Sequence, residues 1–164
     1  MRDSCVSSNP ELIEASGRSL RLWSLIFEAT IWLGLFRVAV WTLPFRRVAA
    51  LCRLVQTRPS EDPDMTPRTD VESPWVEDIS TALRRAADRA PWKCSCLVRS
   101  LAGYAMLRRR HLRGVVYLGI ARRTSGELVA HSWLGLGDLV LTGAGNHHVY
   151  STIAIYRPAS RIPR

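Results

Sequence analysis

Cys96 and His131 are the two residues of this chain whose types and spacing are best suited to chemistry. Cys96 lies in the run Cys94-Ser95-Cys96-Leu97-Val98-Arg99-Ser100, which opens an apolar helical pattern extending to Arg110. His131 follows 35 residues later, in an alternating sequence typical of a strand. Amide donors and the positive pole at a helix start favour a thiolate. If the strand folds back on that helix, the histidine can act as base for a cysteine nucleophile.

The neighbouring cysteine and two histidines offer other interpretations of the same region. Cys94 is either a packing thiol, a redox partner or the nucleophile itself. A metal site could combine Cys94 and Cys96 with His147 and His148, but one C-x-C pair without a second is a weak zinc pattern. We therefore expect no metal and no cofactor.

The elements that would position these residues change from helical to strand periodicity after Gly114. Two helices are predicted over 75–90 and 97–110, each with one apolar face. Strands are predicted over 115–120, 128–136, 139–141 and 149–156, separated by short turns. Helices followed by an antiparallel meander predict an α+β fold.

Composition divides the chain into five segments. Four prolines and five acidic residues lie between positions 57 and 74 and interrupt any helix there. A second amphipathic helix is predicted from Phe45 to Val55. The expected organisation is a flexible N-terminus (1–19), a hydrophobic helical segment (20–56), a linker or surface loop (57–74), a catalytic core (75–157) and a basic tail (158–164).

The apolar run from residue 20 to 43 raises the question of a membrane. Its length suits a span, although Glu28 and Arg37 interrupt it. These two charges are nine residues apart and so fall on opposite faces, where they cannot form a local pair. The run predicts a helix buried against the protein or a partner, with peripheral or spanning membrane association as the alternative.

Charge and cysteine content bear on compartment and partners. The net charge is +9, and residues 91–164 hold 11 basic residues against Glu127 and Asp138. Such a surface attracts acidic partners. No aromatic–basic interleaving or known nucleic-acid module accompanies the charge, so we expect no nucleic-acid partner. The N-terminus lacks a secretory pattern, which favours a reducing, cytoplasmic setting.

Several motifs together resemble one enzyme family. They are Cys96-Leu97-Val98-Arg99-Ser100, the arginine-terminated helix behind it, the strand 115–120 and Ala130-His131-Ser132-Trp133. This set is similar to the transglutaminase-like cysteine peptidases of lasso peptide biosynthesis, the leader-removing B proteins. Those proteins show Cys-Leu-x-Arg-Ala/Ser and, further on, His-Ala-Trp. The hydrophobic segment ending in Leu43-Pro44-Phe45-Arg46-Arg47 adds to the resemblance, which covers most of residues 20–150.

The resemblance implies a papain/transglutaminase-like fold and a cysteine protease acting in RiPP maturation. Cys96 would attack the peptide bond that joins leader to core, with His131 as base. The chain would be the stand-alone leader peptidase, a hydrolase working with a lasso precursor peptide, a small leader-recognition protein and an ATP-using lasso cyclase. Two alternatives remain open: transglutaminase-like acyl transfer to an amine, and a non-enzymatic protein that binds a membrane or a partner.

The third catalytic residue is where this sequence departs from the family. The family usually has an aspartate just after the strand that follows the histidine motif, and an ungapped placement puts Gly143 there. Asp138 is the nearby carboxylate and becomes the candidate. Asn146 or the Thr142 hydroxyl could orient the imidazole instead, since this group mainly fixes tautomer and ring position. A catalytic dyad is the remaining alternative.

Overall fold

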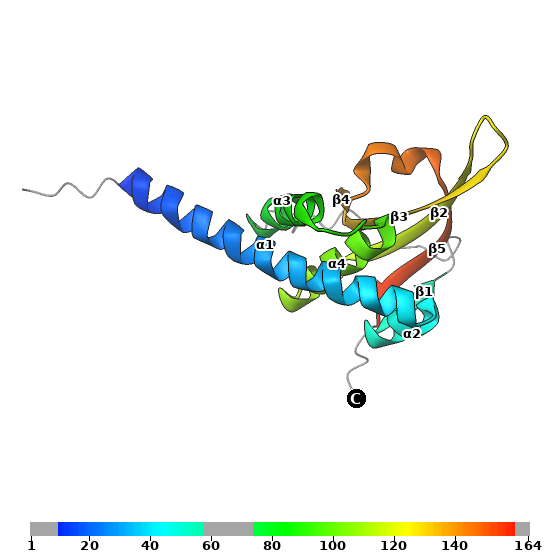
Figure 1. Cartoon of the computed structure of the whole chain (residues 1–164), viewed down its shortest axis with the longest axis horizontal. Coiled ribbons are helices and arrows are strands. Elements are labelled where there is room, and N and C mark those ends of the chain that lie inside the picture. The colour runs from blue at the N-terminus through cyan, green and yellow to red at the C-terminus, as the bar shows by residue number, and fades with distance from the viewer. Residues whose placement is uncertain (1–9, 58–73, 160–164) are drawn as a thin grey trace, which may run out of the picture.

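The computed structural model describes residues 10–57 and 74–159, which form helices packed on one antiparallel sheet (Figure 1). The expected α+β class, with an apolar N-terminal helix, is confirmed. In chain order the elements are α1 (Pro10–Thr42), α2 (Phe45–Leu51), β1 (Leu54–Thr57), α3 (Pro74–Arg89), α4 (Cys96–Arg109), β2 (Val115–Arg122), β3 (Leu128–Leu136), β4 (Leu139–Thr142), the 3₁₀ helix η2 (Ala144–Val149) and β5 (Ser151–Pro158).

The five strands are ordered β1-β5-β2-β3-β4, and every neighbouring pair is antiparallel. β2 and β3 form a long hairpin in which Tyr117 pairs with Trp133 and Gly119 pairs with His131. β4 is an edge strand that pairs only with residues 134–136 of β3. The portion of β3 that carries His131 therefore lies beyond the end of β4.

The N-terminal half contributes a strand that its sequence did not reveal. The predicted second helix ends at Leu51 and not at Val55, and Arg53 follows it with a left-handed backbone (φ 52°). The next four residues form β1, which pairs with β5. The segment before the proline-rich stretch and the segment after it thus share one sheet.

The core lies between the sheet and three helices. α4 is the central helix, with nine buried residues and contacts to α1, α3 and β3. α3 presents one apolar face to α1 and α4, as its spacing predicted. The largest fully buried side chains include Leu25, Leu33, Ile79, Leu83, Leu101, Tyr104, Met106, Leu107 and Leu134.

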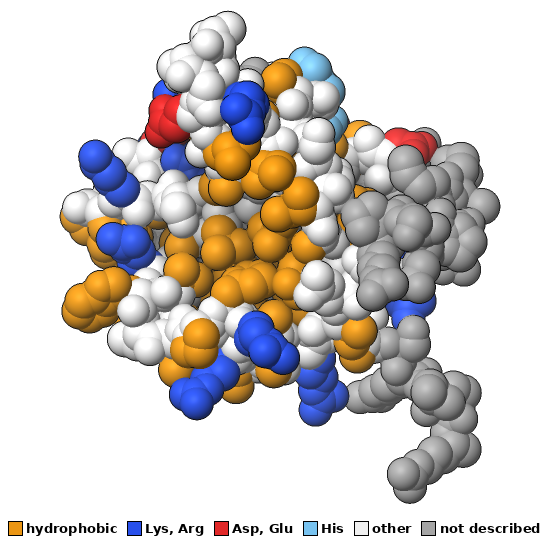
Figure 2. Space-filling model, turned by 90° about the vertical axis from the view of Figure 1, so that its right-hand side faces the viewer, with side chains coloured by type: hydrophobic (Ala, Val, Ile, Leu, Met, Phe, Trp, Pro, Cys, Tyr) orange, Lys and Arg blue, Asp and Glu red, His pale blue; other side chains and the backbone are white. Residues whose placement is uncertain are grey.

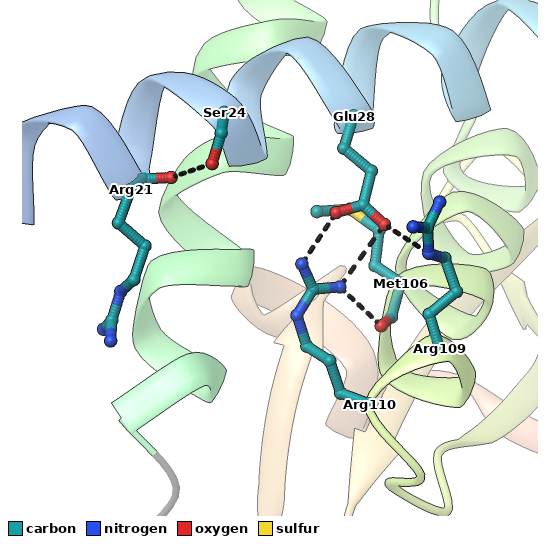
Figure 3. A network of polar contacts seen from close by, with 6 residues as sticks. All are labelled: Arg21, Ser24, Glu28, Met106, Arg109 and Arg110. Carbon is teal, nitrogen blue, oxygen red and sulfur yellow. Dashed lines mark hydrogen bonds and ion pairs between the residues drawn. The ribbon is translucent and has the colours of Figure 1, made fainter.

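α1 begins earlier than its apolar run. It is helical from Pro10, whereas the sequence predicted a flexible segment up to residue 19. A proline is well tolerated in the first helical turn, and residues 11–16 are mostly good helix formers. As expected, Glu28 and Arg37 form no local pair. Glu28 instead pairs with Arg110 (2.7 Å) and Arg109 (3.5 Å) at the end of α4 (Figure 3). Arg37 is exposed.

Candidate active site

Cys96 is the first residue of α4. Ser95 caps the helix, because its hydroxyl accepts the Val98 amide (3.4 Å) while its carbonyl accepts the Arg99 amide (3.1 Å). The amides of Cys96 and Leu97 precede the intrahelical hydrogen bonds, so they can serve a bound anion. The half-buried Cys96 side chain lies at this positive pole. The position suits a nucleophile with an oxyanion-stabilising amide beside it.

Cys94 lies in a different environment. It precedes the helix cap, and its thiol donates to the Trp92 carbonyl (3.9 Å). Burial raises the pKa of the Cys94 thiol, although the positive charge of Arg99 opposes that rise. A raised pKa leaves little thiolate at neutral pH. Of the two neighbouring thiols, Cys96 has the better placement for nucleophilic attack.

His131 is held at the edge of the sheet by a backbone carbonyl. Its Nε2 lies 3.2 Å from the Gly143 oxygen, and its ring packs against Tyr150 at 4.8 Å between ring centroids. A carbonyl can only accept, so Nε2 carries the hydrogen of this bond. In the neutral imidazole, Nδ1 is then the nitrogen with a free lone pair. His131 is thus arranged to take a proton at Nδ1.

The segment Thr142–Gly143 links the environments of Cys96 and His131. Ser100 lies one helical turn after Cys96, and its hydroxyl is 3.2 Å from that of Thr142. The next residue is Gly143, whose carbonyl binds His131. Among the described residues no hydrogen bond joins Cys96 to His131. Strand alternation places the imidazole on the sheet face opposite the one that contacts α4.

Glycine is the only residue type that fits position 143 without distortion. Its backbone is left-handed (φ 75°). A Cβ atom there would lie 2.9 Å from the His131 Nε2 and 2.9 Å from the Ser132 oxygen, closer than real contacts of this kind. The absence of a side chain therefore allows the Gly143 carbonyl to meet the imidazole. Gly143 is also the residue that an ungapped placement of the resembling motif puts at the position of the expected aspartate.

Two of the three side chains proposed for the orienting role lie elsewhere, and the third is outside the described part of the chain. Asp138 is exposed in the β3–β4 turn, beyond the end of β3 at Leu136. Leu136 is five residues from His131, or about 16 Å at the usual rise of a strand. Thr142 bonds Ser100 and not the imidazole. Asn146 falls within η2, but its side chain is outside the described part of the chain. Neither of the described side chains, Asp138 and Thr142, contacts the imidazole of His131. Its hydrogen-bond partner is a backbone oxygen, which cannot be predicted from residue type.

Comparison with known proteins supports this architecture. A family model described as the transglutaminase-like superfamily matches residues 39–154, from the end of α1 to β5. The chain belongs to the transglutaminase-like superfamily. No curated protein and no solved structure matches it significantly. This transglutaminase-like superfamily usually comprises cysteine-dependent enzymes, and Cys94, Cys96 and His131 all fall within the matched region.

A cavity of about 500 Å³ adjoins the candidate site of this transglutaminase-like chain. It lies between α3 and the outer edge of β4 and ends at Thr142 and Gly143. Ser80 closes part of the strand edge by donating to the Leu141 carbonyl (3.0 Å). Arg84 and Arg99 contribute positive charge to the lining, against Glu77. The groove can receive an extended peptide segment beside the site.

The other histidines of the transglutaminase-like core do not assemble with Cys94 and Cys96. His147 bonds the Ala144 carbonyl (2.9 Å) within η2, and its ring packs near Trp133. Within residues 10–57 and 74–159, no group of three or more His, Cys, Asp or Glu side chains is placed to hold a metal ion.

Figure 2 views the molecule from the sheet side, where apolar side chains gather in the middle and charged ones lie around the rim.

Proposed function

We propose that this chain is a cysteine peptidase that removes the leader from a ribosomally made lasso precursor peptide. The observation that carries the proposal is a cysteine at the start of the buried α4 helix, one turn from the Ser100–Thr142 contact, with His131 bonded to the next residue. Membership of the transglutaminase-like superfamily supports thiol chemistry at this position. The lasso role rests on the motif resemblance described above.

In the proposed reaction Cys96 attacks the carbonyl carbon of the leader–core peptide bond. The oxyanion is stabilised by the amide at the start of α4. His131 takes the thiol proton at Nδ1 and delivers it to the departing core amine. Water then hydrolyses the thioester, which releases the leader and restores the thiol. The two side chains share no hydrogen bond in the free protein. The proposed reaction therefore requires the imidazole to move within hydrogen-bonding distance of the thiol when substrate binds, since catalytic hydrogen bonds often tighten only in the complex.

The partners follow from the same proposal. The peptidase receives the precursor from a small leader-recognition protein in the cytoplasm, and the freed core amine passes to the lasso cyclase. The groove beside β4 would hold the precursor in extended form. No metal or cofactor takes part in these steps.

The test is mass spectrometry of the precursor peptide after incubation with the protein and its companion. We expect one cleavage site in the wild type and in Cys94→Ala, and none in Cys96→Ala or His131→Ala. Cleavage that survives Cys96→Ala would overturn the assignment of the nucleophile. A product that carries an added amine in place of water would show acyl transfer, and would overturn hydrolysis as the reaction.

A further inference from the structure

One face of α1 is apolar and uncovered along most of the helix. Its residues recur every three or four positions, so they form a single face. Their exposed fractions run from 46% at Ile31 to 82% at Trp41. We refer to this face as the α1 stripe: Leu20, Trp23, Phe27, Ile31, Leu35, Val38 and Trp41. From first to last it extends about 31 Å at the usual helical rise.

The opposite face of α1 is fixed in the fold. Leu25, Ala29 and Leu33 are at most 1% exposed and lie in the core with α3 and α4. Glu28 is ion-paired with the end of α4 (Figure 3). Arg21 is paired with Asp78 of α3. α1 therefore cannot leave the helical layer without breaking the core and both charge contacts.

This packing decides between two membrane geometries. Residues 19–42 are long and apolar enough to cross a bilayer, with a mean hydropathy of 1.5. A crossing would strip α1 from α3 and α4 and place Glu28 near the bilayer centre, which is costly. A helix lying in the plane of the membrane surface needs only its uncovered face to enter the lipid. The folded protein presents that face.

The charges around the α1 stripe favour an anionic surface. Among the described side chains, Glu28 of α1 and Asp78 of α3 are both already paired with arginines. Exposed arginines occur within the sequence of the stripe and shortly after it, at Arg37, Arg46, Arg47 and Arg53. Tryptophans near both ends of the stripe suit the interfacial layer of a bilayer, where an apolar ring and a polar N–H are both accommodated.

We propose that the α1 stripe docks the protein, in plane, on an anionic lipid bilayer. The family match begins at residue 39, so nearly all of the stripe precedes the part shared with the transglutaminase-like superfamily. α1 extends past α3 at its N-terminal end (Figure 1), and the stripe faces away from the helices that cover the other side. Docking of this kind would hold the enzyme at a membrane surface whatever peptide it cleaves.

Flotation of the full chain with lipid vesicles tests the proposal. One set of vesicles is phosphatidylcholine alone, and the other contains equal parts of phosphatidylcholine and phosphatidylglycerol. We expect the wild type to float with the anionic vesicles, less so at high salt because screening weakens the arginine contribution. The double variant Phe27→Gln/Leu35→Gln should partition about a hundredfold more weakly, since two apolar side chains no longer enter the lipid.

The matched control is Val149→Gln/Ile153→Gln, which changes two comparably exposed apolar residues on η2 and β5. Its partitioning should stay within about twofold of the wild type, and thermal unfolding should show that both double variants fold. Equal partitioning of both variants would overturn the proposal. Resistance of the bound protein to alkaline extraction would show a span, and would also overturn it. The proposal would also be overturned if the wild type bound neither set of vesicles but formed a dimer, and if the α1 double variant were monomeric.

Discussion

At the scale of single residues, the tautomer of His131 is set by a main-chain oxygen. The Gly143 carbonyl accepts from Nε2 at 3.2 Å and leaves Nδ1 for proton transfer. A carboxylate in that place would also stabilise the imidazolium, as in triads. A neutral carbonyl orients the ring without adding a negative charge. This arrangement makes glycine geometry, and not an acidic side chain, the feature on which His131 depends.

Substitution of Gly143 tests this dependence. In Gly143→Ala the added Cβ lies 2.9 Å from Nε2 and the backbone keeps a positive φ, so the loop must shift. We expect precursor cleavage to fall about a hundredfold from the displaced imidazole, and stability to fall by about 1–3 kcal/mol. Gly145→Ala is the control, because its Cβ would meet nothing within 4 Å. Equal activity of the two variants would contradict the orienting role.

Asp138 provides the complementary test. It is exposed in a turn remote from His131, so Asp138→Asn should leave the cleavage rate within about twofold of the wild type. His131→Ala should lower the rate by about two to four orders of magnitude, as loss of a general base does. The measurement is the initial rate of product formation for both variants. A large loss in Asp138→Asn would restore a carboxylate to the mechanism.

At the scale of elements, α1 and α4 are joined by a charge contact that spans 82 positions of sequence. The two terminal guanidinium nitrogens of Arg110 donate to the Glu28 carboxylate, at 2.7 and 3.3 Å, and the same arginine lies over the Trp75 ring. The contact ties the helix that carries the α1 stripe to the helix that carries Cys96. Its partners come from separate elements, so no local pattern could predict it.

Removal of that carboxylate should lower stability measurably. Glu28 is 16% exposed, and Glu28→Gln leaves the Arg109–Arg110 pair without its counter-charge. We expect a loss of about 1–3 kcal/mol in the free energy of unfolding. Glu127→Gln is the control, because its ion pair with Arg123 is 3.9 Å long and two-thirds exposed on both sides. That pair should be worth less than about 1 kcal/mol. Urea melts of the two variants give the comparison, and equal losses would contradict the account.

The contact of α4 with the turn after α2 predicts a sensitivity to alkali. Burial raises the pKa of Tyr104, whose hydroxyl donates to the Cys52 carbonyl (3.3 Å). The unfolded chain therefore loses this proton first, from about pH 10. The stability contribution is complete below that pH and is lost as pH rises through the higher pKa of the folded state. We expect the melting temperature to fall above about pH 10, and to fall less steeply in Tyr104→Phe. Parallel slopes for both proteins would contradict this.

At the scale of the whole molecule, the sequence predicted the α+β class, α4 and the strands that follow, because their periodicities are long and regular. The four-residue β1 escaped prediction because its sequence continues a helical pattern and its partner, β5, lies about a hundred residues away. The role of the Gly143 carbonyl could not be predicted, because every residue has a backbone oxygen and the residue type does not show which one meets the imidazole. Cys96 and His131 remain proposals from sequence and family, and the fold places their surroundings together at one sheet edge.

The proposed mechanism requires that the fold activates Cys96 as a nucleophile, with His131 as its base. The most direct measurement is the rate of iodoacetamide alkylation at each cysteine, followed by peptide mass spectrometry at neutral pH. We predict that Cys96 reacts fastest in the native protein, well ahead of Cys94 and the buried Cys52, whose pKa values burial raises. Its rate should fall to that of the urea-unfolded chain in His131→Ala. A native Cys96 no more reactive than in urea, and unaffected by His131→Ala, would contradict the account.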